Sequence, residues 1–153
     1  VMPETADGWL EQVAMDAARV QLVREVAKAK HGDRLRVYYP HTKGGEAIYV
    51  HAKTAIVDDR LIRVGSANLN NRSMGLDSEC DVTIDTALPA NRGLEPTIRR
   101  LRESLIAEHL DGDPQAVARR FETTGSLIET IEGLRNGGRS LAWLDLVPPG
   151  PLD

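Results

Sequence analysis

The sequence predicts an α/β domain in which a mixed β-sheet is flanked by helices. Runs rich in β-branched and aromatic residues, at 34–39, 47–57, 61–64 and 78–85, are typical of strands. Apolar residues recur at three- and four-residue steps at 13–27 and 94–105, as they do in helices that pack on one face. Because both patterns alternate along the chain, we expect about five strands with helices packed against them.

Composition narrows the class of protein. The chain has 153 residues, enough for one domain with its own core. Its formal net charge of −4 gives no general attraction to nucleic acid. The single cysteine, Cys80, excludes an internal disulfide framework and favours a reducing compartment. No apolar run approaches the roughly 20 residues that span a bilayer.

The N-terminal part predicts a helix followed by a strand. The helical pattern of residues 13–27 is expected to stop at His31-Gly32-Asp33. The strand at 34–39 is expected to end at Pro40, because proline has no N–H to donate to a sheet.

Residues 47–64 predict a β-hairpin. Asp58-Asp59-Arg60 separates two strand patterns and is typical of a tight turn, since aspartate bonds its own backbone there. On the first strand, His51 and Lys53 lie two residues apart, so their side chains are expected on one face.

A group of polar residues lies where the second strand of this hairpin ends. Gly65 allows a sharp bend, and Ser66 and Asn68 bring a hydroxyl and an amide to the end of the sheet. Together with His51 and Lys53 they could hold an anion, because lysine supplies charge and histidine can attack phosphorus or transfer a proton.

The strand pattern at 78–85 alternates between two kinds of side chain. Cys80, Val82 and Ile84 are expected on one face, and Cys80 is expected to be a buried small apolar residue and not a nucleophile. Glu79 and Asp81 are expected on the other face.

Three helices are predicted after this strand. The first buries an apolar stripe and leaves charged residues in solvent. Its stripe is Leu94, Ile98, Leu101 and Leu105, and its solvent-facing residues are Arg99, Arg100, Arg102 and Glu103. Asp113-Pro114 is a cap followed by a first-turn proline, and opens a helix through Phe121. Ser126-x-x-Glu129 is a capping box that opens a third helix, ended by Asn136-Gly137-Gly138.

The residues of the hairpin resemble a known signature. The segment 51–68 is similar to the HKD motif of the phospholipase D superfamily. Its order is His51-x-Lys53, four residues, Asp58, six residues and then Gly65-Ser66-x-Asn68. Glu79 lies eleven residues after Asn68, where that family commonly has an acidic residue that orients the histidine. The flanking segments look like the C-terminal end of a larger bacterial member.

The resemblance implies a mechanism and a set of site residues. In the family, two HKD motifs meet to build one active site, in which one histidine forms a phosphohistidine, the other protonates the leaving alcohol, and neither a metal nor a cofactor is needed. The expected catalytic residues of this chain are His51, Lys53, Asp58, Ser66, Asn68 and Glu79. Glu79 is expected to bond the His51 ring. For Asp58 a structural role in the turn is favoured over a chemical one, and Ser66 and Asn68 could instead cap a short helix near Asn70.

The expected organisation is that of a half-site. We expect a phospholipase D-like half-domain at 1–110, without its first strand, a helical C-terminal extension at 111–146, and an extended or disordered tail at 147–153. The second motif would come from the same parent chain or from a homodimer mate, as in small single-motif members of the family. A cytoplasmic location, or one peripheral to the inner membrane with some membrane contact, is expected.

Three functions remain open. The first is hydrolysis or transphosphatidylation of phospholipids. The second is a nuclease of the same superfamily, which is less favoured because the basic residues are scattered over the helices. The third is a non-catalytic fragment that pairs with another HKD half and binds phosphate weakly.

Overall fold

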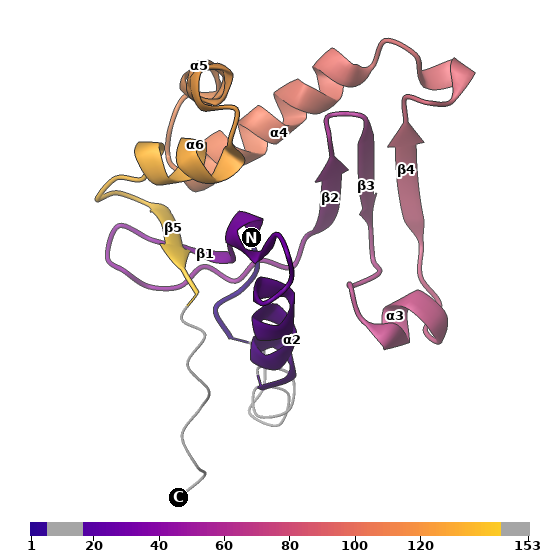
Figure 1. Cartoon of the computed structure of the whole chain (residues 1–153), viewed down its shortest axis with the longest axis horizontal. Coiled ribbons are helices and arrows are strands. Elements are labelled where there is room, and N and C mark those ends of the chain that lie inside the picture. Colours follow the sequence, from indigo (N-terminus) through magenta and orange to yellow (C-terminus); the bar gives the residue numbers. More distant parts are fainter. Residues whose placement is uncertain (6–16, 145–153) are drawn as a thin grey trace, which may run out of the picture. The chain divides into compact units, whose positions relative to one another are not determined.

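A computed structural model describes residues 1–5 and 17–144 and confirms the expected α/β class (Figure 1). The described strands form two antiparallel sheets, one of two strands and one of three, and not the single mixed sheet that was expected. Residues 13–16 of the predicted helix at 13–27 lie outside the described residues, and so does the whole predicted tail at 147–153. No described helix is long and apolar enough to cross a membrane.

The chain divides into two compact units. The first unit comprises residues 1–50, 109–111 and 124–153, and the second comprises residues 51–108 and 112–123. Each unit therefore contains segments from both sides of residue 110. The domain boundaries expected at residues 110 and 146 stay a prediction.

The first unit is built on a two-stranded sheet. Strand β1, Tyr38–His41, pairs antiparallel with β5, Ser140–Trp143, and Leu141 of β5 is completely buried. Pro40 lies inside β1 opposite Leu141, so the expectation that it ends the strand is wrong. A proline is tolerated at the edge of a small sheet, and its carbonyl still accepts the Ile48 N–H at 2.8 Å.

The helices of the first unit are short. Helix α2, Ala17–Ala27, ends before the expected stop, and Gly32–Arg34 forms a 3-10 turn. Helix α6, Leu127–Leu134, begins where the capping box predicted, since the Ser126 side chain accepts the Glu129 N–H at 3.3 Å. Helix α6 ends a few residues before the glycine pair at 137–138.

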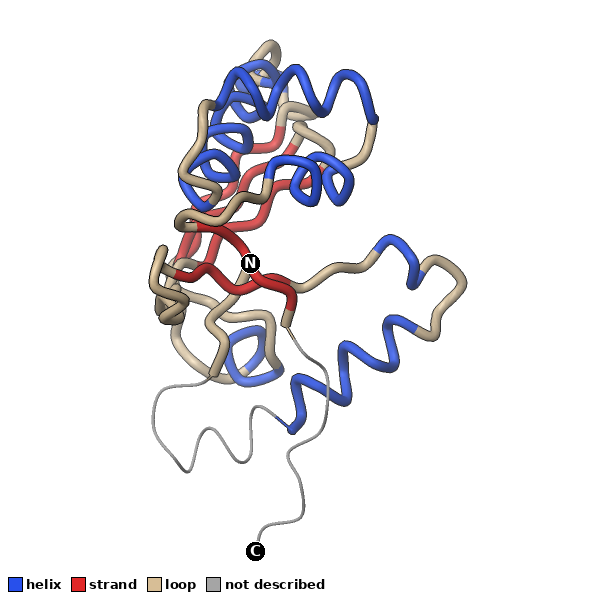
Figure 2. Tube along the Cα trace, turned by 90° about the vertical axis from the view of Figure 1, so that its left-hand side faces the viewer, coloured by secondary structure: helices blue, strands red, loops and turns tan. Residues whose placement is uncertain are grey.

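The second unit contains the three-stranded sheet in the order β2-β3-β4. Its strands are Lys53–Val57, Leu61–Gly65 and Asp81–Asp85, each shorter than its sequence pattern. The five-residue helix α3, Asn71–Gly75, connects β3 to β4. A 3-10 turn at Pro89–Asn91 precedes helix α4, Glu95–His109, and a short loop leads from α4 into helix α5, Pro114–Thr124 (Figure 1). Figure 2 shows the helices of the chain in blue and its strands in red.

The turn between β2 and β3 confirms the predicted hairpin. Asp58 and Asp59 have φ angles of 51° and 52°, and the Arg60 N–H donates to the Val57 carbonyl at 2.9 Å. Positive φ at both central residues is typical of a type I′ hairpin turn. Because aspartate tolerates this left-handed conformation better than most residues do, the two carboxylates suit the turn.

Helix α4 corrects the predicted apolar stripe. Ile98 is 1% exposed as expected, but Leu101 and Leu105 are 45% and 44% exposed. Arg102 and Glu103, which were expected in solvent, are buried in their place. The cause is the ionic and aromatic partners of Arg102, which are the Asp59 carboxylate at 2.9 Å and the Phe121 ring at 4.3 Å.

Strand β4 corrects the expected burial of Cys80. The thiol is exposed, and Val82 and Ile84 on the following strand are 66% and 37% exposed. The strand lies at the edge of its sheet and pairs only with β3 among the described strands. The period-two pattern therefore indicated the strand correctly, whereas the expected burial of Cys80 is wrong.

Candidate active site

Three strand ends meet at one end of the second unit's sheet. Because β2, β3 and β4 are antiparallel, the start of β2, the end of β3 and the start of β4 lie side by side. Lys53, Gly65 and Asp81 lie directly opposite one another across the three strands and form one cross-strand row. Five of the six predicted site residues lie in or next to this row, namely His51, Lys53, Ser66, Asn68 and Glu79.

His51 and Lys53 occupy the entry to β2. His51 lies two residues before the strand and is exposed. The Lys53 ammonium donates to the His51 carbonyl at 2.8 Å. An ammonium has three N–H donors, which leaves two for an anion beside this histidine.

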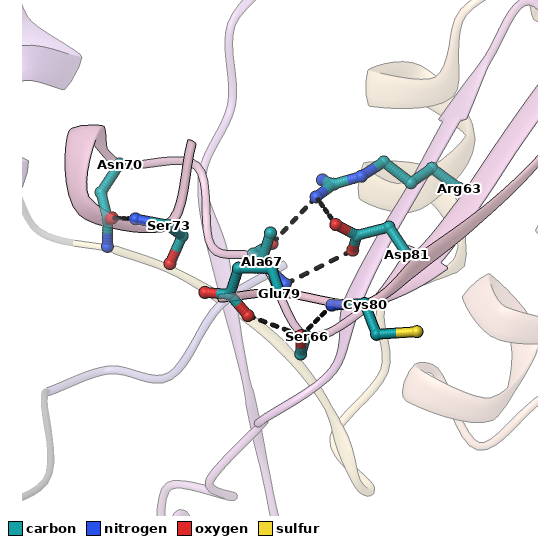
Figure 3. A network of polar contacts seen from close by, with 8 residues as sticks. All are labelled: Arg63, Ser66, Ala67, Asn70, Ser73, Glu79, Cys80 and Asp81. Carbon is teal, nitrogen blue, oxygen red and sulfur yellow. Dashed lines mark hydrogen bonds and ion pairs between the residues drawn. The ribbon is translucent and has the colours of Figure 1, made fainter. Parts of the chain in front are cut away.

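Ser66 joins the end of β3 to the segment before β4. Its hydroxyl donates to the Glu79 carboxylate at 2.5 Å and accepts the Cys80 N–H at 3.0 Å (Figure 3). The Ser66 proton is therefore directed at Glu79, and the serine orients that carboxylate. The hydrogen bond expected between Glu79 and the His51 ring stays a prediction.

Asn68 lies just beyond the buried residue Ala67 and is exposed. The alternative that Ser66 or Asn68 caps the short helix does not agree with the structure, because Asn70 is the cap of α3. The Asn70 side chain accepts the Ser73 N–H at 2.9 Å. Asn68 is thus not engaged as the cap of α3, and its amide group is of a kind that can donate to an anion.

Asp58 is the predicted site residue that lies elsewhere. It occupies the β2–β3 turn, at the end of the sheet opposite to α3 (Figure 1). Five residues of extended strand place it about 17 Å from Lys53. Its side chain is exposed, whereas the neighbouring Asp59 makes the ion pairs with α4. This placement favours the structural role that was preferred for Asp58.

Arg63 and Asp81 belong to the site and were not predicted. The Arg63 guanidinium and the Asp81 carboxylate lie 2.9 Å apart, and both contact the backbone of Ala67 at 3.4 Å (Figure 3). The signal available in the sequence was a pair of opposite charges, Arg63 in an otherwise apolar strand and Asp81 at the start of the next strand. Neither charge belongs to the spacing of the motif, and only the strand register brings them together.

The described segments contain no cluster of side chains suited to bind a metal ion together. Within residues 1–5 and 17–144, no group of three or more histidine, cysteine, aspartate or glutamate side chains is arranged to hold a metal ion. At this end of the sheet Lys53 supplies a cationic group, which suits an anionic ligand.

Comparison with known proteins identifies what this region is similar to. A family model described as Phospholipase D matches residues 11–129. Phospholipase D delta of Arabidopsis thaliana is 42% identical over 69 residues, which cover 41% of this chain and 8% of that protein. Phospholipase D alpha 4 of the same plant is 36% identical over 94 residues, which cover 61% of the chain and 12% of that protein.

A fungal relative gives the same result. Phospholipase D1 of Schizosaccharomyces pombe is 36% identical over 84 residues, which cover 49% of the chain and 6% of that protein. The chain thus spans only a small part of the length of these relatives. No solved structure matches the chain at a comparable level. The expected bacterial origin stays a prediction.

Proposed function

Because the chain belongs to the phospholipase D family, we propose that it supplies half of an active site that hydrolyses or transfers a phospholipid phosphodiester. The observation that supports this proposal is the placement of His51, Lys53 and Asn68 at adjacent strand ends of one sheet. A nucleophile or general acid, a cation and an amide donor are the groups that a phosphoryl transfer needs.

The proposed reaction proceeds in two displacements. In the first, a neutral imidazole nitrogen attacks phosphorus, the bond from phosphorus to the leaving oxygen breaks, and a second, protonated histidine gives its proton to the leaving alcohol. In the second, water or another alcohol attacks the phosphohistidine, the phosphorus–nitrogen bond breaks, and the proton of the attacking hydroxyl returns to the second histidine. His51 is one of these two histidines, and its counterpart belongs to the other half-site.

The neighbours of His51 have separate roles in this proposal. Lys53 and Asn68 hold the non-bridging oxygens, on which negative charge is concentrated in the transition state. Glu79 acts as the acceptor that orients an imidazole N–H and stabilises its cationic form. Ser66 fixes the Glu79 carboxylate through the hydrogen bond of 2.5 Å.

The proposed partner is a second HKD half, from a longer parent chain or from a second copy of this chain. Apolar side chains on the segment that follows Asn68 support a covering partner. Leu69, Met74 and Leu76 are 82%, 63% and 84% exposed. Exposed apolar residues that cluster next to a half-site are typical of a surface that another protein buries.

The first experiment measures the mass of the chain by light scattering at several concentrations, and assays the same fractions with a chromogenic phosphodiester and with phosphatidylcholine vesicles. An active dimer would support a site completed by two copies of His51. An inactive monomer would move the proposal to a two-motif parent. The same fractions are also assayed with a dinucleotide, and its turnover without turnover of phospholipid would support the nuclease alternative.

A matched pair of variants tests the catalytic role of His51 in the active assembly. We expect His51→Ala to abolish turnover and to leave the circular dichroism spectrum unchanged. The control is His31→Ala, because His31 is exposed in a turn of the first unit. An undiminished rate in His51→Ala would refute the catalytic role.

A further inference from the structure

The pair Arg63 and Asp81 lies directly beneath the polar loop of the site. Gly65 pairs with Asp81 and Arg63 pairs with Thr83, so the two charged residues are diagonal neighbours on one face of β3 and β4. Their side chains are 20% and 23% exposed, and the ion pair has a length of 2.9 Å. A pair at this burial is better shielded from solvent than a surface salt bridge.

Both members of the pair also hold the backbone of the loop. The Asp81 Oδ1 atom accepts the Ala67 N–H at 3.4 Å, and the Arg63 Nη2 atom donates to the Ala67 carbonyl at 3.4 Å. These contacts restrain the peptide groups on both sides of Ala67, which is 3% exposed. Figure 3 shows these contacts around Ala67 with Ser66 beside it. Ser66 and Asn68 are the residues on either side of Ala67, so the orientation of both depends on these restraints.

Gly65 provides a second, independent observation. A Cβ atom at position 65 would overlap the Asp81 carboxylate and would lie 2.6 Å from the Cys80 carbonyl oxygen. The carboxylate therefore occupies the space that a side chain would take. The glycine of the motif is required here because it gives Asp81 room to reach Ala67.

The charge of the pair matters for an anionic substrate. Lys53, Gly65 and Asp81 form one cross-strand row, so Lys53 and Asp81 are on the same face with no side chain between them. An unpaired carboxylate at this position would repel a phosphodiester. Arg63 removes that repulsion while Asp81 keeps its contact with the loop.

We propose that Asp81, neutralised by Arg63, is a positioning residue that holds Ala67 and thereby fixes Ser66 and Asn68 beside Lys53. The consequence for catalysis rests on the proposed function, because it assumes that Asn68 and Lys53 bind the phosphodiester. The restraint on the loop does not depend on that function, and it can be measured separately.

The test combines steady-state kinetics on bis(p-nitrophenyl) phosphate, measured in the active assembly, with hydrogen exchange of the chain. In Asp81→Asn we expect kcat to fall by about 10-fold to 100-fold, because small displacements of a reacting group have effects of this size. KM should not rise, since the freed Arg63 adds a positive charge near the anion. The Ala67 and Asn68 amides should exchange faster while the amides of β2 are unchanged.

Asp85→Asn is the matched control. Asp85 lies on the same strand and face, pairs with Arg60 at 3.8 Å and accepts the Ala87 N–H at 2.9 Å, but it is at the far end of the sheet. We expect this variant to leave both kcat and the exchange of Ala67 unchanged. Equal losses of kcat in the two variants would show a general structural effect and would overturn the proposal.

The two measurements distinguish failure of the proposed function from failure of the positioning role of Asp81. If neither the chain nor a two-motif parent that contains it turns over a phosphodiester, the proposed function fails, and hydrogen exchange alone decides whether Asp81 holds the loop. If turnover is present and Asp81→Asn retains the full kcat, the positioning role is refuted. If Asp81→Asn does not fold, Arg63→Lys replaces it, because it keeps the charge but loses the fork that reaches both Asp81 and Ala67.

Discussion

The adjacent turn residues Asp58 and Asp59 allow a sharp test of the second unit's energetics. Their φ angles are 51° and 52°, so asparagine, which tolerates the left-handed region, can replace either one without strain. The Asp59 side chain is 12% exposed and pairs with Arg102 at 2.9 Å and with Arg99 at 3.3 Å. Asp58 has an exposed side chain.

We expect Asp59→Asn to lower the free energy of unfolding of this unit by about 3 kcal/mol. Breaking a buried ion pair costs about 3–5 kcal/mol because one charge is left uncompensated, and the amide oxygen of asparagine still accepts a hydrogen bond. The Arg102 guanidinium would keep its stacking on Phe121 but lose its nearest carboxylate. Asp58→Asn should change the same quantity by less than about 0.5 kcal/mol.

The assay is hydrogen exchange of peptides that cover β2 and β3, together with urea denaturation followed by far-ultraviolet circular dichroism. Fluorescence is unsuitable, because every tryptophan and tyrosine lies outside residues 51–108 and 112–123. A loss of about 3 kcal/mol corresponds to exchange roughly 150-fold faster in the hairpin. Equal stability of the two variants would refute the assignment of Asp59 as the anchor of α4.

Three further predictions concern the rest of the chain. Tyr38→Phe removes the hydrogen bond of 2.6 Å from the phenol to Glu132 and should cost about 1–2 kcal/mol in urea denaturation. Burial, and after it the Glu132 hydrogen bond, raises the pKa of Tyr38, so the free energy of unfolding should decline as the pH rises above about 10. Tyr38→Phe should make this decline less steep, and an unchanged dependence on pH would contradict the prediction. The same hydrogen bond lowers the pKa of Glu132, whose stabilising contribution should be lost as the pH falls below about 4. Ser126→Ala should cost about 1 kcal/mol through the lost cap of α6, measured by the same denaturation. Ile98→Ala should lower the free energy of unfolding by about 3 kcal/mol and Leu101→Ala by less than about 1 kcal/mol. A larger loss in Leu101→Ala than in Ile98→Ala would contradict the exposure of Leu101.

Much of the secondary structure could be predicted from local sequence patterns. The β2–β3 hairpin, its aspartate turn, and the caps at Asp113 and Ser126 are determined by residues within a few positions of each other. The grouping of His51, Lys53, Ser66 and Asn68 could be predicted for the same reason, since these residues lie at adjacent strand ends of a hairpin. Glu79 was predicted from the resemblance to the HKD motif. These features need no contact with distant parts of the chain.

The remaining features depend on partners far away in sequence. Strand β5 has no pattern of its own and forms because it pairs with β1. Helix α4 turns Arg102 inward because Asp59 and Phe121 compensate its charge there, and an apolar stripe cannot reveal such partners.

What the amino-acid sequence determined by itself was the α/β class, the family, the hairpin and most of the residues at the strand ends. Only the tertiary structure decided that Asp58 lies at the opposite end of the sheet from the other site residues. It also decided that Ser66 faces Glu79 and that Arg63 and Asp81 hold Ala67. The physical reason is that a side chain's partner is set by strand register, and register brings together residues that no short motif contains.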